Sequence, residues 1–262
     1  MTAALEVRGV GISFGGLRAL DGVDLVVEPG EIVGLIGANG AGKTTLFDCI
    51  SGLLPGEGSV LVGGRDVTGL APHARARAGL GRSFQDARLF TSMTVLDTLR
   101  VASEKGAARP AGVVSTLLGF GADHEAAATR AALDVVAAFG LTAYRDKLVG
   151  ELSTGTRRVV DLAAIVIQKP SVVLLDEPSS GIAQREAEAL GPLLRQVRDQ
   201  LGCALLVIEH DMPLLLGLAE RLYALETGRV IASGEPEVVV HDPEVVRSYL
   251  GDDPAALGRS GT

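Results

Sequence analysis

The feature that most constrains this chain is a glycine-rich run at residues 37–44, which reads Gly-Ala-Asn-Gly-Ala-Gly-Lys-Thr. An apolar segment, Glu31 to Ile36, precedes it, and a segment of helical character from about Ala41 to Ser51 follows it. Glycines at these spacings let backbone N–H groups curl around phosphate oxygens, while the positive end of the following helix faces them. The run therefore predicts a phosphate-binding loop between a buried strand and a helix.

The residues of this loop have separate expected roles. Lys43 is expected to reach the β- and γ-phosphates of a nucleotide, and the Thr44 hydroxyl is expected to bind Mg²⁺. A chance match to the pattern should occur in roughly 1% of chains of this length, so we predict phosphate binding. The other residues expected to bind the nucleotide here are Gly37, Asn39, Gly40, Ala41, Gly42 and Thr45.

A second apolar run, Val172 to Leu175, ends in the carboxylates Asp176 and Glu177. Many strands end in acidic residues, so this pattern alone says little. Beside a phosphate loop, however, such a strand delivers a carboxylate that holds Mg²⁺ through water. We therefore predict that Asp176 belongs to the metal site and that Glu177 polarises an attacking water molecule.

Composition and charge exclude some functions. The chain has 262 residues and a net charge of -8, so nucleic acid is not an expected partner. The arginines at positions 75, 77, 82 and 88 cluster, and we interpret them as a solvated helical face. Cys49 and Cys203 are expected to be buried free thiols, which fits a reducing cytosol. No signal peptide and no apolar run of about 20 residues is visible, so we expect any membrane role to come through a partner.

The remaining pattern indicates a mixed α/β protein. Alternating apolar residues predict strands near Leu5 to Val10 and Val23 to Val27 and a hairpin after Ser59 to Val62. Residues 86–167 are rich in helix-forming residues, with a loop or helical insertion at 106–121. We further expect a helix over 185–201 interrupted at Gly191-Pro192, a buried strand over 203–208, two strands within 221–232, and a frayed end at 251–262.

Four further short sequences follow the phosphate loop in a characteristic order. They are Arg-Ser-Phe-Gln ending at Gln85, Leu-Ser-Thr-Gly-Thr-Arg-Arg at 152–158, Leu-Leu-Asp-Glu-Pro at 174–178, and Ile-Glu-His-Asp at 208–211. In this order the chain resembles the ATPase domain of ABC transporters over nearly its whole length. The resemblance implies ATP and Mg²⁺ as ligands and ATP hydrolysis as the activity.

The resemblance also implies residue roles. Gln85 would sense the γ-phosphate, the metal and the permease, Glu177 would be the catalytic base, and His210 would hold the γ-phosphate. Ser153 and Gly155 would close on ATP held by a second ATPase subunit. Phe14 would stack on adenine. Taken singly, Gln85 could be a surface residue, His210 a capping or core residue, and Phe14 a core residue.

The chain departs from the family pattern at three positions. Thr154 and Thr156 replace the first glycine and the glutamine of the Leu-Ser-Gly-Gly-Gln signature, and Ala183 stands where an aspartate is expected. These changes bear on communication between subunits, whereas the phosphate chemistry is unaffected. They keep open the alternative of a poorly hydrolysing regulatory subunit.

The implied fold is a P-loop (RecA-like) ABC ATPase core with a small antiparallel β subdomain and an inserted helical subdomain. The expected divisions are 1–85 and 168–234 for the nucleotide-binding core, 86–167 for the helical subdomain and 235–262 for a C-terminal tail. A non-transport ABC ATPase of translation or DNA repair is disfavoured, because the chain has one cassette and no sustained heptads.

The segments 89–97, 228–236 and 241–251 resemble the longer ATPase subunit of branched-chain amino-acid importers, while a lipopolysaccharide-export ATPase is similar at the tail. This branch implies two transmembrane permease subunits, docked near residues 85–96, and an extracytoplasmic solute-binding protein. It places the chain at the cytoplasmic face of the membrane. The second ATPase subunit could be a copy of this chain or a shorter relative.

Overall fold

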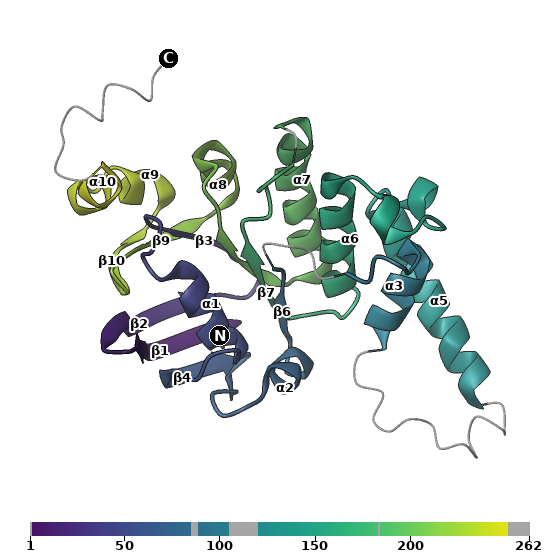
Figure 1. Cartoon of the computed structure of the whole chain (residues 1–262), viewed down its shortest axis with the longest axis horizontal. Coiled ribbons are helices and arrows are strands. Elements are labelled where there is room, and N and C mark those ends of the chain that lie inside the picture. Colours follow the sequence, from purple (N-terminus) through teal and green to yellow (C-terminus); the bar gives the residue numbers. More distant parts are fainter. Residues whose placement is uncertain (1, 85–88, 105–119, 183, 251–262) are drawn as a thin grey trace.

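The computed structural model describes residues 2–84, 89–104, 120–182 and 184–250. Two β-sheets and a set of helices build these ranges into the arrangement of Figure 1. Within the described ranges, no helix is both long enough and apolar enough to span a membrane. Gln85, Arg88 and Ala183, as well as the expected frayed end at 251–262 and most of the expected insertion at 106–121, lie outside them.

The smaller sheet is antiparallel and has the strand order β2-β1-β4-β5. Its alternating apolar residues, predicted from the sequence, face the interior, because successive side chains of a strand point to opposite faces. Leu5 pairs with Val27 on one side and with Val62 on the other. The strands are β1 (Leu5–Phe14), β2 (Leu17–Val27), β4 (Glu57–Val62) and β5 (Arg65–Asp66).

The larger sheet has the order β10-β9-β3-β8-β7-β6 and is parallel except for the β9–β10 hairpin. Three of its strands, β3 (Ile32–Ile36), β7 (Val172–Asp176) and β8 (Ala204–Ile208), are buried at every residue. Continuous apolar runs are typical of parallel strands covered on both faces. The others are β6 (Leu80–Arg82), β9 (Arg221–Glu226) and β10 (Arg229–Gly234).

Alternate residues of the central strands enter two different cores. Val33 and Leu35 join the core between the two sheets, which also holds the buried face of helix α1 (Lys43–Ser51). Ile32 and Ile36 join the core on the opposite face, under α7 (Gln184–Leu201) and α8 (Met212–Leu218). Helix α1 therefore lies between the sheets, and the loop before it is fixed by both (Figure 1).

A third core lies among helices at one side of the molecule (Figure 1). It is formed by α3 (Val95–Ser103), α5 (Phe120–Ala138) and α6 (Thr154–Val166), with two short 3-10 helices, Thr142–Tyr144 and Val149–Glu151. Helix α2 (Pro72–Arg77) packs against α1, and α9 (Pro236–Val240) and α10 (Pro243–Leu250) cover the β9–β10 edge.

Two expectations were wrong. Helix α7 is not interrupted, and Pro192 lies inside it. A proline removes only one helical hydrogen bond, and Leu190 and Leu194 bury the helix against the sheet on both sides of it. The arginine cluster is not a solvated face either, because Arg75 and the Arg82 side chain are buried, although Arg77 is exposed.

Candidate nucleotide site

The predicted site residues meet at one edge of the parallel sheet. The phosphate loop follows β3, Asp176 ends β7, Glu177 follows it, and His210 follows β8. Because these strands are parallel, their carboxyl ends lie at the same edge, where α/β proteins of this type bind ligands. The topology thus brings together groups from Gly37 to His210, which are 173 residues apart in the chain.

The phosphate loop needs glycine at two positions for steric reasons. Gly37 has φ 152°, and a Cβ atom there would lie 2.2 Å from the carbonyl oxygen of Leu225. Gly42 has φ 106°, and a Cβ atom would lie 2.9 Å from the carbonyl oxygen of Ala19. Both conformations are rare for residues with side chains, so the loop can approach its neighbours only as glycine.

Lys43 is the first residue of α1 and is only 7% exposed. Its ammonium donates to the carbonyl oxygens of Gly37 at 2.6 Å and Ala38 at 3.1 Å, and so holds the loop closed. Burial lowers the Lys43 pKa, while the charges of Glu177 and Asp176 oppose this shift. A desolvated cation ringed by carbonyl dipoles is well placed to receive phosphate oxygens.

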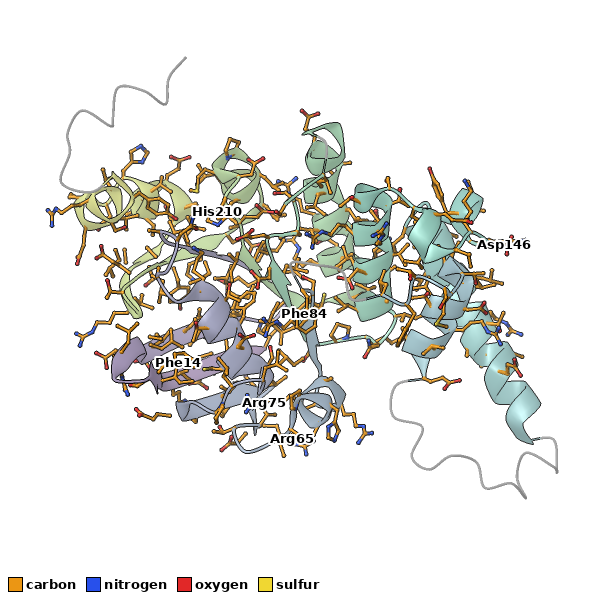
Figure 2. The ribbon with its side chains drawn as sticks, in the orientation of Figure 1. Phe14, Arg65, Arg75, Phe84, Asp146 and His210 are labelled. Carbon is orange, nitrogen blue, oxygen red and sulfur yellow. The ribbon has the colours of Figure 1, made fainter. Side chains whose placement is uncertain are left out.

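A cavity of about 280 Å³ opens over this loop. Glu177 lines it from the sheet side, and Leu17, Arg18 and Ala19 line it from the start of β2. The loop residues that line it are Asn39, Gly40, Gly42, Lys43, Thr44 and Thr45. Phe14 pairs with Leu17 across the β1–β2 turn and is 47% exposed, so its ring is available for stacking rather than buried in a core (Figure 2).

Asp176 is buried, and its surroundings are rich in carboxylates. Burial raises its pKa, Arg82 counteracts that shift, and the neighbouring Glu177 and Asp48 raise it further. A hydroxyl from Thr44 and a carboxylate from Asp176 are oxygen ligands of the kind Mg²⁺ prefers, and a crowded set of negative charges would be relieved by a divalent cation. The residues present therefore fit a magnesium ion carried in with a nucleotide.

Glu177 and His210 lie in contact. The His210 Nε2 atom is 3.0 Å from Glu177 Oε1. The His210 side chain is 46% exposed and the Glu177 side chain is 21% exposed. Glu177 has φ 47°, an uncommon conformation for a residue with a side chain, and its N–H donates to the Ile208 carbonyl at 2.9 Å. The bond to β8 holds this conformation beside the histidine, which is labelled in Figure 2.

Ser153 and Gly155 lie at the start of α6, in the helical part of the molecule. The exposed Ser153 is the N-cap: its hydroxyl accepts from the Thr156 N–H at 3.1 Å and lies 2.9 Å from the Thr156 hydroxyl. Thr156, which replaces the glutamine of the family pattern, therefore supports the serine through a local hydrogen bond.

Sequence reasoning missed Arg82, whose guanidinium lies between helix α1 and the Asp176 carboxylate. It is 2.7 Å from Asp48 and 3.9 Å from Asp176, and it stacks over Phe84 at 4.9 Å. The neighbouring Ser83 hydroxyl accepts from the Asp176 N–H at 3.2 Å. A charged residue at the end of a short strand, three residues before the expected Gln85, was the signal that could have revealed it.

A phosphate loop, a buried carboxylate strand and a polar edge of a parallel sheet define an α/β nucleotide-binding protein of the P-loop class. Comparison with known proteins narrows this class. The family model described as ABC transporter matches residues 20–180, and one described as branched-chain amino acid ATP-binding cassette transporter matches residues 229–255.

Similar curated proteins cover almost the whole chain. The branched-chain amino acid transport ATP-binding protein LivG of Escherichia coli is 37% identical over 95% of this chain and 98% of its own length. BraF of Pseudomonas aeruginosa is 35% identical with the same coverage of both chains. The lipopolysaccharide export ATP-binding protein LptB of Escherichia coli is 32% identical over 96% of this chain and 98% of its own length.

The fold agrees with solved structures. A nucleotide-free ATP-binding cassette from an ABC transporter superposes with a TM-score of 0.82 at 28% identity, covering 96% of this chain and all of that one. This chain therefore belongs to the ATP-binding subunits of ABC transporters, and it is an ATPase. The predicted family and fold class are confirmed.

Proposed function

We propose that this chain hydrolyses Mg-ATP at the sheet edge described above and thereby powers a membrane permease. The observation that supports the hydrolytic part most directly is the 3.0 Å contact between Glu177 and His210 at the edge that also holds Lys43. A carboxylate beside the phosphate loop can take a proton from water, and an imidazole beside it can hold the γ-phosphate.

The proposed roles follow from the positions of the described residues and from the resemblance to the family. The loop amides and Lys43 bind the phosphates, Thr44 and Asp176 hold Mg²⁺, and Glu177 accepts the proton of the attacking water. The metal, when bound, neutralises charge on the phosphate oxygens. Phe14 stacks on the adenine ring. Gln85, which lies outside the described residues, is proposed to sense both the γ-phosphate and the permease.

Replacing Glu177 with glutamine tests the assignment. Glu177→Gln keeps the shape of the side chain but cannot accept a proton, so ATP should still bind while turnover falls about 10²- to 10⁴-fold. The exposed Glu237→Gln, far along the chain on α9, is the matched control and should hydrolyse normally. Normal turnover in Glu177→Gln would show that the base lies elsewhere.

We also propose a working dimer in which Ser153 and Gly155 of one subunit close on ATP held by the loop of the other. The support is that Ser153 is exposed at the start of a helix, a second position where backbone N–H groups can face an anion. ATP would then join the subunits, and hydrolysis would release them.

A cysteine cross-link tests the dimer. Cysteines introduced near Gly40 and Ser153 should give a dimer band when ATP is present and no dimer without it. The parent chain is a suitable background, because its own Cys49 and Cys203 are buried. A cross-link formed only within one chain would exclude the shared site.

The division of the chain is proposed to be functional. Residues 1–85 and 168–234 form the nucleotide-binding core, 86–167 the helical subdomain and 235–262 the tail. Two permease subunits would dock near residues 85–96, and the chain would reach the cytoplasmic face of the membrane only through them. Binding of the isolated chain to protein-free liposomes would contradict this arrangement.

The proposed cargo is a branched-chain amino acid or a related small solute, delivered by an extracytoplasmic binding protein. The match of residues 229–255 and the names of LivG and BraF support this choice, whereas the similarity to LptB supports lipid export. ATPase activity of the reconstituted transporter should rise with leucine and its binding protein. A rise with lipopolysaccharide instead would favour export, and failure to hydrolyse in any complex would favour a regulatory subunit.

A further inference from the structure

Glu209 is a buried carboxylate that the proposed chemistry does not use. It follows the wholly apolar strand β8, directly precedes His210, and is only 3% exposed. A charge removed from water is costly unless hydrogen bonds or an opposite charge compensate it. The partners of Glu209 therefore indicate what it is kept for.

Those partners come from two different loops. The N–H and hydroxyl of Ser179 donate to the two carboxylate oxygens at 2.7 Å and 2.8 Å. The backbone N–H groups of His210 and Asp211 donate to Oε2 at 3.0 Å and 3.4 Å. Within the part of the chain that the structure describes, all of these donors are neutral, and they match a carboxylate, which only accepts.

The two loops are the ones that carry the proposed catalytic groups. Ser179 lies two residues after Glu177, and Glu209 lies one residue before His210. The side chains of Glu177 and His210 are themselves in contact at 3.0 Å. Two sets of contacts therefore join the loop after β7 to the loop after β8. One is the contact between Glu177 and His210, and the other is the pair of hydrogen bonds from Ser179 to Glu209.

Capping of helix α8 does not account for this arrangement. The Asp211 side chain already accepts from the Leu214 N–H at 3.0 Å and is the N-cap of that helix. The Ser179 donors belong to the loop after β7, in a turn in which the Ser180 N–H donates to the Glu177 carbonyl at 3.0 Å. Glu209 therefore ties one loop to the other rather than finishing a helix.

We propose that Glu209 is a positioning residue. By joining the two loops, it holds the proposed base Glu177 and the proposed γ-phosphate ligand His210 at a fixed distance from each other, so that the loops move as one unit. The proposal rests on the roles assigned to Glu177 and His210 above. Because Glu209 does not line the nucleotide cavity, it should affect the chemical step and leave ATP affinity unchanged. Misplacement of a catalytic group by about 1 Å can reduce the rate about 10²-fold.

The test is the pair Glu209→Gln and Glu209→Asp in the full chain. Glutamine keeps the size but turns an NH2 group toward the Ser179 and His210 donors, whereas aspartate keeps the acceptor charge on a shorter arm. Glu209→Gln should lower kcat on the order of 10- to 100-fold with the Kd for ATP changed by less than about 2-fold. Glu209→Asp should recover part of that loss.

A second variant covers the case in which Glu209→Gln does not fold. Ser179→Ala removes only the hydroxyl that donates to Glu209 Oε2. It should lower kcat by a few-fold, on the scale of one lost hydrogen bond, with ATP affinity unchanged. Ser180→Ala, one residue further along the same turn, is the matched control and should keep the parent kcat. Normal kcat in Ser179→Ala would then overturn the proposal.

Other outcomes also decide the question. A folded Glu209→Gln chain with the parent kcat overturns the proposal, and so does a loss of kcat that only follows the fraction of unfolded protein. Glu177→Gln, measured in parallel, distinguishes a failure of the proposed site from a failure of the positioning role. If Glu177→Gln hydrolyses ATP normally, the proposed site itself is wrong. If it is inactive while the Glu209 variants are normal, only the positioning role fails.

Discussion

The N–H of Gly37, the first residue of the phosphate loop, donates a 2.5 Å hydrogen bond to the hydroxyl of Tyr249, 212 residues further along the chain. The carbonyl of the same glycine accepts from the Lys43 ammonium at 2.6 Å. Both polar groups of Gly37 are thus occupied, one by the loop itself and one by helix α10. The C-terminal segment that matches the branched-chain transporter family model therefore contacts the phosphate loop directly, through the hydrogen bond between Tyr249 and Gly37.

Removing this hydroxyl should weaken nucleotide binding. Tyr249→Phe leaves the Gly37 N–H without its acceptor, and a lost hydrogen bond of about 0.5–1.5 kcal/mol corresponds to a Kd for Mg-ATP about 2- to 10-fold higher. Isothermal titration calorimetry measures this. Tyr223→Phe is the matched control, because its hydroxyl accepts from the Val26 N–H between the sheets. It should leave ATP affinity unchanged, and equal affinities in all three proteins would contradict the coupling.

Lys43→Ala should weaken Mg-ATP binding more strongly. It removes a buried cation that can meet the phosphates, and a charge-assisted contact is worth about 1.5–3 kcal/mol, or roughly 10- to 150-fold in Kd. Lys147→Ala is the control, since that ammonium lies 5.3 Å from the Tyr144 ring in the helical part. If Lys43→Ala bound Mg-ATP with the affinity of the parent chain in the same titration, the phosphate loop would not be part of the nucleotide site.

Arg75 is expected to stabilise the fold through helix α1. Its guanidinium donates to the carbonyls of Cys49 and Ile50 at 2.8 Å each, and it also bonds Leu70 and Thr68. These contacts occupy carbonyls in the last turn of α1, where a helix runs out of N–H donors of its own, and the Cys49 carbonyl also accepts from the Gly52 N–H at 3.1 Å. Arg75→Met should therefore lower the free energy of unfolding by on the order of 3 kcal/mol.

Urea denaturation measures the Arg75 effect, and the same helix provides the control. Arg77 is two residues further along α2 and exposed, so Arg77→Met should change stability by less than about 0.5 kcal/mol. Equal denaturation midpoints for the Arg75 and Arg77 variants would show that the carbonyl contacts contribute nothing to stability.

Asp161 on α6 should make stability depend on pH. Burial raises its pKa from 3.8 to about 6, and Arg158 only partly offsets this. Since the folded protein binds the proton more tightly than the unfolded chain, stability falls as the pH rises from about 4 to about 6 and then levels off. Asp161→Asn, which carries no charge, should gain on the order of 2 kcal/mol over the parent at pH 7.5.

That gain should shrink as the pH falls toward 4, because the parent carboxyl is then protonated in the folded state and increasingly in the unfolded one. Urea titrations of both proteins at several pH values test this. The exposed Asp146→Asn should show no comparable trend. A gain independent of pH would mean that the charge of Asp161 is not its cause.

Local spacing determined much of this protein. The phosphate loop, the carboxylates after β7 and the central strands could be predicted, because a loop of fixed glycine spacing and a run of apolar residues depend on neighbours in the chain. Lys43, Asp176 and Glu177 were identified in this way, whereas His210 was identified through the resemblance to the family. The structure places all four at one sheet edge. The order of the motifs further identified the family.

Only the tertiary structure decided which polar residues are buried and what they hold. Arg75 was predicted to lie on a solvated face, but it is buried because its guanidinium bonds to the end of α1. Pro192 was predicted to interrupt its helix, but the helix packs against the sheet on both sides of the proline. Glu209 and Tyr249 carry no local signal of their partners, because those partners lie 30 and 212 residues away. Burial and long-range hydrogen bonds arise when distant segments pack, and sequence spacing alone cannot specify them.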